Sequence, residues 1–318
     1  MAAPAPGGVG HTGGVRWYVI GLALVAGCGR FGFATRIDDG GHDGLADDAG
    51  DASPAADAGI CHAGAWGTPA AIAGTVTGSE KADPSISTDE LELFFDSNRA
   101  GGQARAIWRA TRPTRADAFS VVGLVPAVDS AMDDTDSDIT PDGLTLYFRS
   151  NRSGKNTIYV ATRVTTSDAF VFQGLLPFSD PASTARSGPS VTGDELTMFY
   201  TRNDIDVATA TRPDRASTFT FVRQLTEVNV PASDGDPSTT PDGLELFFSS
   251  YRNGPAAIFT ASRATAADPF SAPVEMPELL GPGSAAGTPD ISSDGRTLYY
   301  FVDVGGQLDL YTSSRSCP

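Results

Sequence analysis

The chain has 318 residues, of which 40% are hydrophobic, and a formal net charge of −17. This length and composition suffice for one substantial hydrophobic core and an appendage. The strong negative charge argues against nucleic acid and anionic lipid surfaces as partners, because both repel an acidic protein.

Residues 1–28 have the pattern of a bacterial lipoprotein signal. Arg16 precedes a short apolar run that ends in Leu-Val-Ala-Gly-Cys, which resembles a lipobox with Cys28 as the acylated residue. The run is short for a transmembrane helix, so we expect anchoring to the cell envelope through lipid alone. Gly29 is not an aspartate, which favours the outer membrane. The alternative is an ordinary secretory signal with an incidental cysteine.

Residues 29–65 are rich in Asp, Ala and Gly, with no Lys or Arg after Arg36. Such a segment has too little apolar surface to order itself, and its like charges repel one another. We expect a disordered tether between the anchor and the remainder of the chain.

Residues 66–318 contain five copies of one repeat, near 83–128, 136–178, 188–230, 236–280 and 288–315. The second copy shows the pattern most clearly. Asp142-Gly143 favours a two-residue type I′ hairpin turn between strands. Residues 144–148 and 157–163 are rich in aromatic and β-branched residues, as strands are, and Phe170 opens a fourth strand. The same turn position is occupied by Asp89, Asp142, Asp194, Asp242 and Asp294.

Four short strands in about 50 residues form one blade of a β-propeller. The sequence therefore predicts an all-β fold, a five-bladed β-propeller of four-stranded antiparallel blades. The pattern S-x-D-G-x-x-L-Y-F…S-x-R-x-G…I-Y-x-A-T-R resembles the WD-repeat-like propeller family typified by the periplasmic TolB-type propeller. That resemblance implies contact with other envelope lipoproteins.

The last blade needs a strand from the start of the repeat region. The fifth copy ends at Arg315 without a fourth strand, whereas Trp66 occupies the position of an unused fourth strand before the first copy. We expect the segment at Trp66 to complete the last blade. Cys61 and Cys317 then fall at equivalent points of the interrupted loop, so a disulfide is expected there in an exported protein. The alternative is two separate free thiols.

Carboxylates are the only chemical groups of interest in the expected propeller. All three histidines precede it and its only cysteine is Cys317, which argues against a Ser-His-Asp triad, a Cys-His pair or a His-ligated zinc site within it. The loops entering the innermost strands carry aspartates that we expect at the channel mouth, where they could bind a ligand or Ca²⁺. Alternatively, they cap turns and accept backbone hydrogen bonds. The candidates are Asp83, Asp134, Asp136, Asp138 and Asp236.

We expect from these observations a monomeric, lipid-tethered envelope protein whose propeller is a non-enzymatic scaffold for a protein or a glycan. Two alternatives remain open. One is a glycoside hydrolase or lyase that uses Asp83, Asp136 and Asp236 as acid and base, by analogy with other five-bladed propellers. The other is a structural module stabilised by calcium, without another cofactor.

Overall fold

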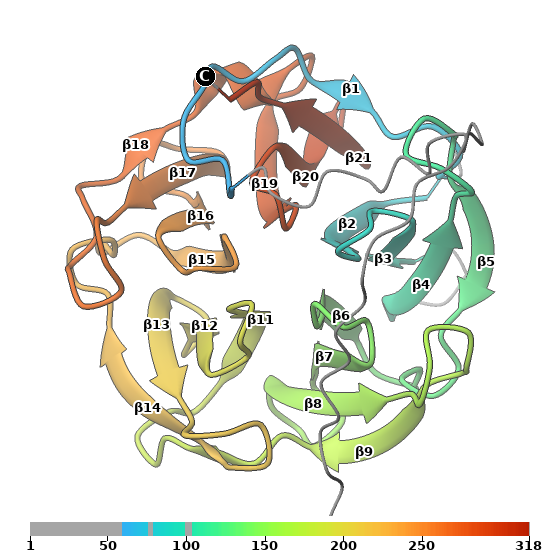
Figure 1. Ribbon diagram of the computed structural model, residues 1–318, viewed down its shortest axis with the longest axis vertical. Helices are drawn as coiled ribbons and strands as arrows, with labels where there is room; N and C mark the ends of the chain where they lie inside the picture. Colours follow the sequence, from blue (N-terminus) through green and yellow to red (C-terminus); the bar gives the residue numbers. More distant parts are fainter. Residues whose placement is uncertain (1–58, 76–78, 99–103, 318) are drawn as a thin grey trace, which may run out of the picture. The chain divides into compact units, whose positions relative to one another are not determined.

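The computed structural model describes residues 59–75, 79–98 and 104–317. They form five antiparallel sheets around a common centre, so the expected five-bladed β-propeller is confirmed (Figure 1). The expected signal at 1–28, with Cys28, and residues 29–58 of the expected tether lie outside the described residues. Within the part that is described, no helix is long and apolar enough to cross a membrane.

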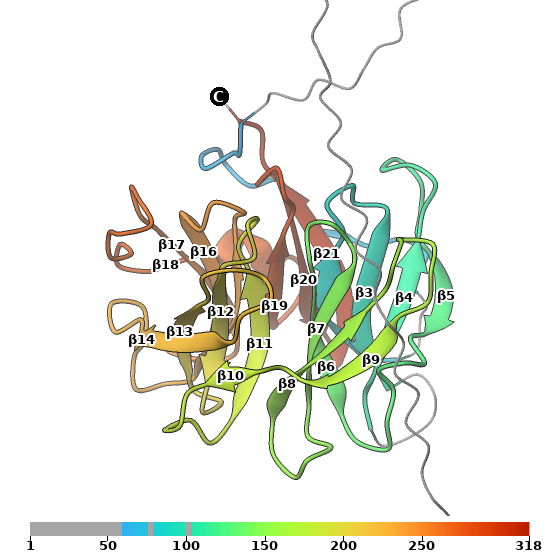
Figure 2. The same cartoon turned by 60° about the horizontal axis from the view of Figure 1, so that its bottom comes forward.

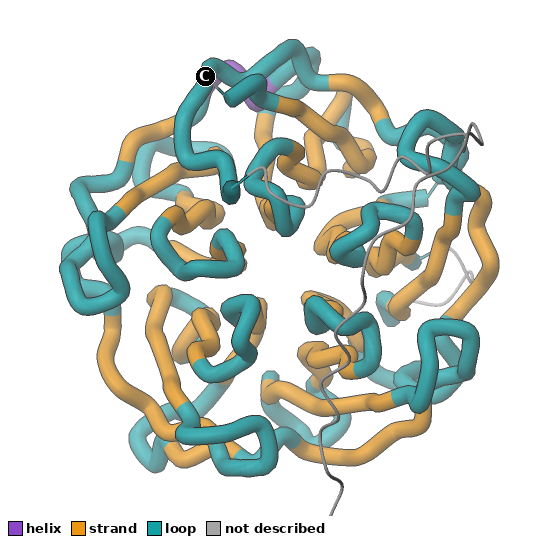
Figure 3. The backbone as a smooth tube through the Cα atoms, viewed as in Figure 1, coloured by secondary structure: helices purple, strands orange, loops and turns teal. Residues whose placement is uncertain are grey.

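Each blade starts with an innermost strand and proceeds outward (Figure 3). Blade 1 comprises β2 (Lys81–Ile86), β3 (Glu92–Ser97), β4 (Ala106–Thr111) and β5 (Ser120–Leu124). Blade 2 comprises β6 (Asp134–Ile139), β7 (Thr145–Ser150), β8 (Thr157–Thr162) and β9 (Val171–Leu175). Blade 3 comprises β11 (Arg186–Val191), β12 (Thr197–Arg202), β13 (Asp206–Thr211) and β14 (Phe219–Gln224), with the short β10 (Phe178–Ser179) parallel to β14.

Blade 4 comprises β15 (Asp234–Thr239), β16 (Glu245–Ser250), β17 (Ala257–Ser262) and β18 (Val274–Glu275). Blade 5 comprises β19 (Ala285–Ile291), β20 (Thr297–Val304), β21 (Gln307–Ser314) and the borrowed β1 (Ala70–Ala71), and a 3₁₀ helix, η1 (Pro277–Leu280), precedes it.

The hydrophobic core lies between blades. The second strand of each blade is buried on both faces, as Leu93, Phe94 and Phe95 of β3 show with 0% exposure. This explains why these strands read as continuous apolar runs instead of alternating patterns. At the interface of blades 1 and 2, Phe94 meets Phe170 edge-to-face with ring centroids 5.8 Å apart.

The N-terminal segment completes the last blade. β1 pairs antiparallel with β21, and Trp66 forms a bridge with Arg315, so the expected closure by this segment is present. A disulfide joins Cys61 to Cys317, with Cα atoms 5.9 Å apart, as expected from the repeat spacing. The segment preceding β1 and the end of the chain lie at the same end of the propeller (Figure 2).

The turns between first and second strands differ from the prediction. Gly143 has φ +70°, but Asp142 is not among the residues with positive φ, so the turn is not type I′. Instead the Gly143 N–H donates to the Thr140 carbonyl at 2.7 Å, and Asp142 Oδ1 accepts from the Leu144 N–H at 2.9 Å. The aspartate is retained because its side chain caps the turn, and the equivalent aspartates of the other four blades do the same.

Candidate active site in the central channel

Each innermost strand contains a β-bulge that faces the channel. The register shifts at one equivalent point in all five strands. One residue there adopts a left-handed conformation with φ between +47° and +50°. Bulges commonly redirect a side chain near a functional site. The five residues, in blade order, are Asp83, Asp136, Gly188, Asp236 and Thr288. They surround a cavity of about 30 Å³.

Asp136 and Asp236 approach each other across Gly188. The Gly188 N–H donates to Asp136 Oδ2 at 3.1 Å, and Asp236 Oδ1 lies 3.2 Å from where a Cβ atom of Gly188 would be. Since the amide nitrogen and Cβ of one residue are about 2.5 Å apart, the two carboxylates lie within about 9 Å of each other. A larger residue at 188 would press on Asp236.

Two arginines lie near the bulge aspartates of the channel. Arg149 Nε lies 3.4 Å from Asp136 Oδ2 and donates to Thr135 Oγ1 at 2.8 Å. Arg105 pairs through Nε with Asp96 and lies 3.3 Å from Glu80. The acidic channel therefore contains guanidinium groups that compensate some of its carboxylates.

Two other channel carboxylates, Asp236 and Asp83, lie in surroundings that disfavour their negative charge. Burial, followed by the charge of Asp136, raises the pKa of Asp236 to about 7, although Arg149 lowers it. Burial also raises the pKa of Asp83 well above its usual range, with the charge of Asp96 as the next cause. A carboxyl group with such a raised pKa can donate a proton near neutral pH.

A second layer of side chains links each blade to the next. Two residues after each bulge residue, an oxygen accepts a hydrogen bond from a backbone N–H of the following blade, at 2.7–3.2 Å. The accepting residues are Ser85, Asp138, Ser190, Ser238 and Asp290, and their respective donors are Ile139, Val191, Thr239, Ile291 and Ile86. Burial raises the pKa of Asp290 to about 7 and that of Asp138 well above its usual range.

The structure gathers four of the five aspartates that the sequence singled out. Asp83, Asp136, Asp138 and Asp236 line the channel cavity. Asp134 does not. Its fully buried carboxylate pairs with Arg152 Nη2 at 2.6 Å within blade 2, so its expected place at the channel mouth is wrong.

Sequence reasoning missed Asp290, Asp96 and Arg149. The repeat alignment contained a signal for each of them. Asp290 stands two residues after Thr288, as Asp138 stands two after Asp136. Asp96 and Arg149 each lie seven residues after the turn aspartate of their copy, at a second-strand position where the five copies carry different residues. That variation marked a position directed at the channel.

The alternative of a Ca²⁺ site gains no support from side-chain geometry. Across 59–75, 79–98 and 104–317, no three or more His, Cys, Asp or Glu side chains are grouped in a way that could hold a metal ion. The channel aspartates are instead engaged with arginines, backbone N–H groups and each other's charge.

Similarity to known proteins is structural. No protein-family model matches the chain, and no curated protein sequence matches it. Among solved structures, the catalytic domain of a GH62 α-L-arabinofuranosidase from Coprinopsis cinerea is similar with a TM-score of 0.55 and 10% identity, over 82% of this chain and 99% of that one. An α-L-arabinofuranosidase from Podospora anserina in complex with cellotriose gives 0.53 and 11%, over 80% and 98%. An endo-arabinase from Bacteroides thetaiotaomicron gives 0.53 and 12%, over 78% and 98%.

TolB structures also match, with TM-scores of 0.44 and 0.43, too low to support an argument. The sequence resemblance to the TolB-type family is therefore supported for the propeller fold alone. The expectation of a non-enzymatic scaffold is corrected by these comparisons, because the structures of higher similarity are glycoside-cleaving enzymes. At 10–12% identity, the similarity to these three structures shows a shared fold alone.

Proposed function

We propose that the chain hydrolyses glycosidic bonds at the mouth of its central channel. The observation that carries this proposal is the placement of Asp136 and Asp236 on either side of Gly188. Glycosidases need two such carboxyl groups, one that donates a proton and one that activates the attacking group.

Asp236 is the proposed general acid. Its pKa of about 7 leaves a large fraction of the group protonated near neutral pH, so it can protonate the leaving-group oxygen. Asp136 is the proposed general base, since its carboxylate faces the Arg149 guanidinium. Asp83 lies on the third side of the cavity, and because burial raises its pKa well above the usual range we assign it no charge-stabilising role.

The size of the cavity suits an attacking water molecule. A volume of about 30 Å³ is too small for a sugar ring but large enough for water. The upper bound of about 9 Å on the separation of the two carboxylates admits the spacing of about 6.5–9.5 Å that leaves room for such a water, and also the spacing of about 5–5.5 Å at which a carboxylate attacks directly. The sugar would then bind above the cavity, at the channel mouth.

The fold supports α-L-arabinofuranosides as the first substrates to test, because two similar structures are α-L-arabinofuranosidases. We further propose that lipid on Cys28 holds the enzyme at the bacterial outer membrane. Its partner would then be a glycan that reaches the cell envelope, with the chain acting as a monomer.

The test is a hydrolysis assay of the purified chain on aryl α-L-arabinofuranosides, other aryl glycosides and arabinan. We expect turnover that falls at least 100-fold in both Asp136→Asn and Asp236→Asn, since general acid–base catalysis contributes about 10²–10⁴-fold. Asp117→Asn is the matched control, because Asp117 is an exposed carboxylate that caps a loop at Thr114.

Circular dichroism and melting temperatures verify that each variant is folded. Equal activity in Asp236→Asn and Asp117→Asn would exclude the assigned acid. Absence of turnover of every glycoside by the folded wild-type chain would overturn the proposed function.

A further inference from the structure

Every blade ends its third strand with an arginine that lies over an aromatic ring. The guanidinium carbon is 4.3–4.7 Å from the ring centroid in each. The pairs are Arg112 with Phe119, Arg163 with Phe170, Arg212 with Phe219, Arg263 with Phe270 and Arg315 with Trp66. These five arginines are equivalent by position in the repeat.

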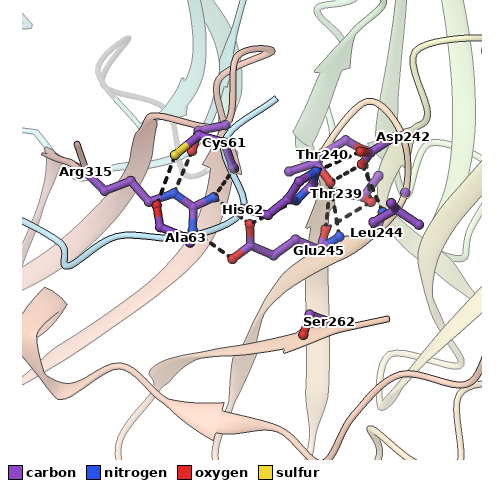
Figure 4. A network of polar contacts seen from close by, with 12 residues as sticks. Cys61, His62, Ala63, Thr239, Thr240, Asp242, Leu244, Glu245, Ser262 and Arg315 are labelled. Carbon is purple, nitrogen blue, oxygen red and sulfur yellow. Dashed lines mark hydrogen bonds and ion pairs between the residues drawn. The ribbon is translucent and has the colours of Figure 1, made fainter. Parts of the chain in front are cut away.

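Four of the five arginines also face a carboxylate. Arg112 forms an ion pair with Glu90, and Arg212 forms one with Glu195; each glutamate belongs to the turn of the same blade as its arginine. Arg163 uses Glu92 of the preceding blade. Arg315 likewise uses Glu245 of the preceding blade, and Figure 4 shows this pair beside Cys61 and His62.

The pair in blade 2 shows how the site is built. Arg163 donates from Nε to the Gly143 carbonyl at 2.6 Å and from Nη1 to the Thr166 carbonyl at 2.9 Å. These bonds orient the two terminal nitrogens toward Glu92, whose oxygens accept from Nη2 at 2.5 Å and from Nη1 at 3.1 Å. The result is a two-point guanidinium–carboxylate pair.

Arg263 in blade 4 has the same orientation but no carboxylate partner. It donates from Nε to the Gly243 carbonyl at 2.8 Å and from Nη1 to the Ala266 carbonyl at 2.9 Å. Thr197 occupies the position of Glu92, and Gly243 replaces the glutamate of the turn. Among the residues that the structure describes, no carboxylate lies within ion-pair distance of Arg263.

Arg263 lies among charges of both signs. Burial, followed by the charge of Arg223, lowers the pKa of Arg263, whereas the charges of Glu227, Asp242 and Asp268 raise it. Arg223 is itself paired with Glu227, at 2.7 Å and 2.8 Å, so Glu227 is already engaged. Arg263 is half-buried whereas Arg163 is buried.

We propose that the Arg263 guanidinium, between blades 3 and 4, binds the carboxylate of a small external ligand. The ligand class is a monocarboxylate such as a hexuronate or acetate, whose two oxygens take the places that Glu92 fills between blades 1 and 2. A carboxylate matches the planar geometry of the guanidinium, and the ring of Phe270 supports the guanidinium from one side. This site is separate from the channel and does not depend on the proposed hydrolase activity.

The experiment measures the melting temperature of the full chain in sodium acetate and sodium glucuronate, against sodium chloride at equal ionic strength. We expect a saturable rise of about 3 °C at a tenfold excess of ligand over Kd. Arg263→Gln should abolish this rise. An equal rise in Arg263→Gln would overturn the proposal, as would the absence of any rise in the wild-type chain.

A second variant tests the site without added ligand. Thr197→Glu supplies the absent carboxylate from within the chain, so it should raise the melting temperature and remove the response to acetate. The matched control is Thr145→Glu, which occupies the same repeat position in blade 2, next to Arg212, which already has Glu195. We expect the control to keep the acetate response without gaining stability. If Thr197→Glu retains the full acetate response, the assignment to Arg263 is wrong.

Discussion

Asp290 in the last blade accepts a hydrogen bond from the backbone N–H of Ile86 in the first blade, at 2.7 Å. The ring is therefore closed at its inner wall as well as at its outer edge, where β1 joins β21. Since four equivalent bonds connect the other neighbouring blades, the innermost strands form a continuous hydrogen-bonded ring around the channel.

Removing one member of this ring should weaken a single blade interface. In Ser190→Ala the Thr239 N–H loses its acceptor in a buried location. We expect the free energy of unfolding to fall by about 1–3 kcal/mol, the cost of an unsatisfied buried donor. Urea unfolding measures the change, with the exposed Ser153→Ala as control. Equal stability of the two variants would contradict a structural role for the ring.

Asp290 should also make stability depend on pH. Its pKa is about 7 in the folded chain and near 3.8 when exposed, so between these values the folded state binds the proton more tightly. Stability contributed by this group is thus present at low pH and is lost as pH rises from about 4 to 7. The slope is at most about 1.4 kcal/mol per pH unit for one such group.

Asp290→Asn tests this dependence, because asparagine can still accept the Ile86 bond but does not titrate. Urea unfolding at several pH values between 4 and 8 should show a smaller loss of stability in this variant than in the wild-type chain. Asp117→Asn, an exposed aspartate, serves as control and should keep the wild-type slope. Identical slopes in all three proteins would show that Asp290 does not titrate as described.

Repeat spacing alone could predict the number of blades, the borrowed strand and the paired cysteines. All three features follow from the nearly constant spacing of the repeats, which can be read directly from the sequence. The turn type could not be predicted from Asp142-Gly143, because Thr140 and Pro141 before it shift the turn by one residue. The pairing of Asp134 with Arg152 depends on the face of the blade on which each side chain lies. The bulge in β6 changes the alternation of faces along that strand, and the sequence does not display it.

The channel site was only partly predictable for a related reason. Its aspartates stand out in the loops, but Asp96 and Arg149 come from second strands that otherwise look like core. Asp290 could have been found by aligning blade 5 with blade 2. The raised pKa of Asp236 depends on burial among other carboxylates, and only the assembled ring creates that environment.

Asp236 should set the alkaline limit of the proposed hydrolase activity. A general acid works when protonated, so kcat/KM should decrease as pH rises through about 7, the pKa of Asp236. The measurement is a pH profile of kcat/KM with an aryl glycoside that is turned over. Asp117→Asn should leave the profile unchanged, whereas Asp236→Glu should move its alkaline limb. An unmoved limb would assign the acid to another residue.

The disulfide should stabilise the closed ring. Cys61 and Cys317 are 256 residues apart, and closing so long a loop contributes about 5 kcal/mol in the chain-entropy description. We expect Cys61→Ser combined with Cys317→Ser to lower the midpoint of urea unfolding. Reductant should lower the wild-type midpoint to that of the variant and leave the variant unaffected. A wild-type midpoint insensitive to reductant would argue against the bond.

The 5.9 Å between the Cα atoms of Cys61 and Cys317 is less than the span of two peptide units. A very short peptide could therefore replace the sulfur bridge and turn the propeller into an uninterrupted circle. A circularly permuted gene could then begin at any loop between blades, because the inner-wall hydrogen bond repeats at every blade interface. Such a permuted chain would open at a surface loop, where a break in the chain is tolerated.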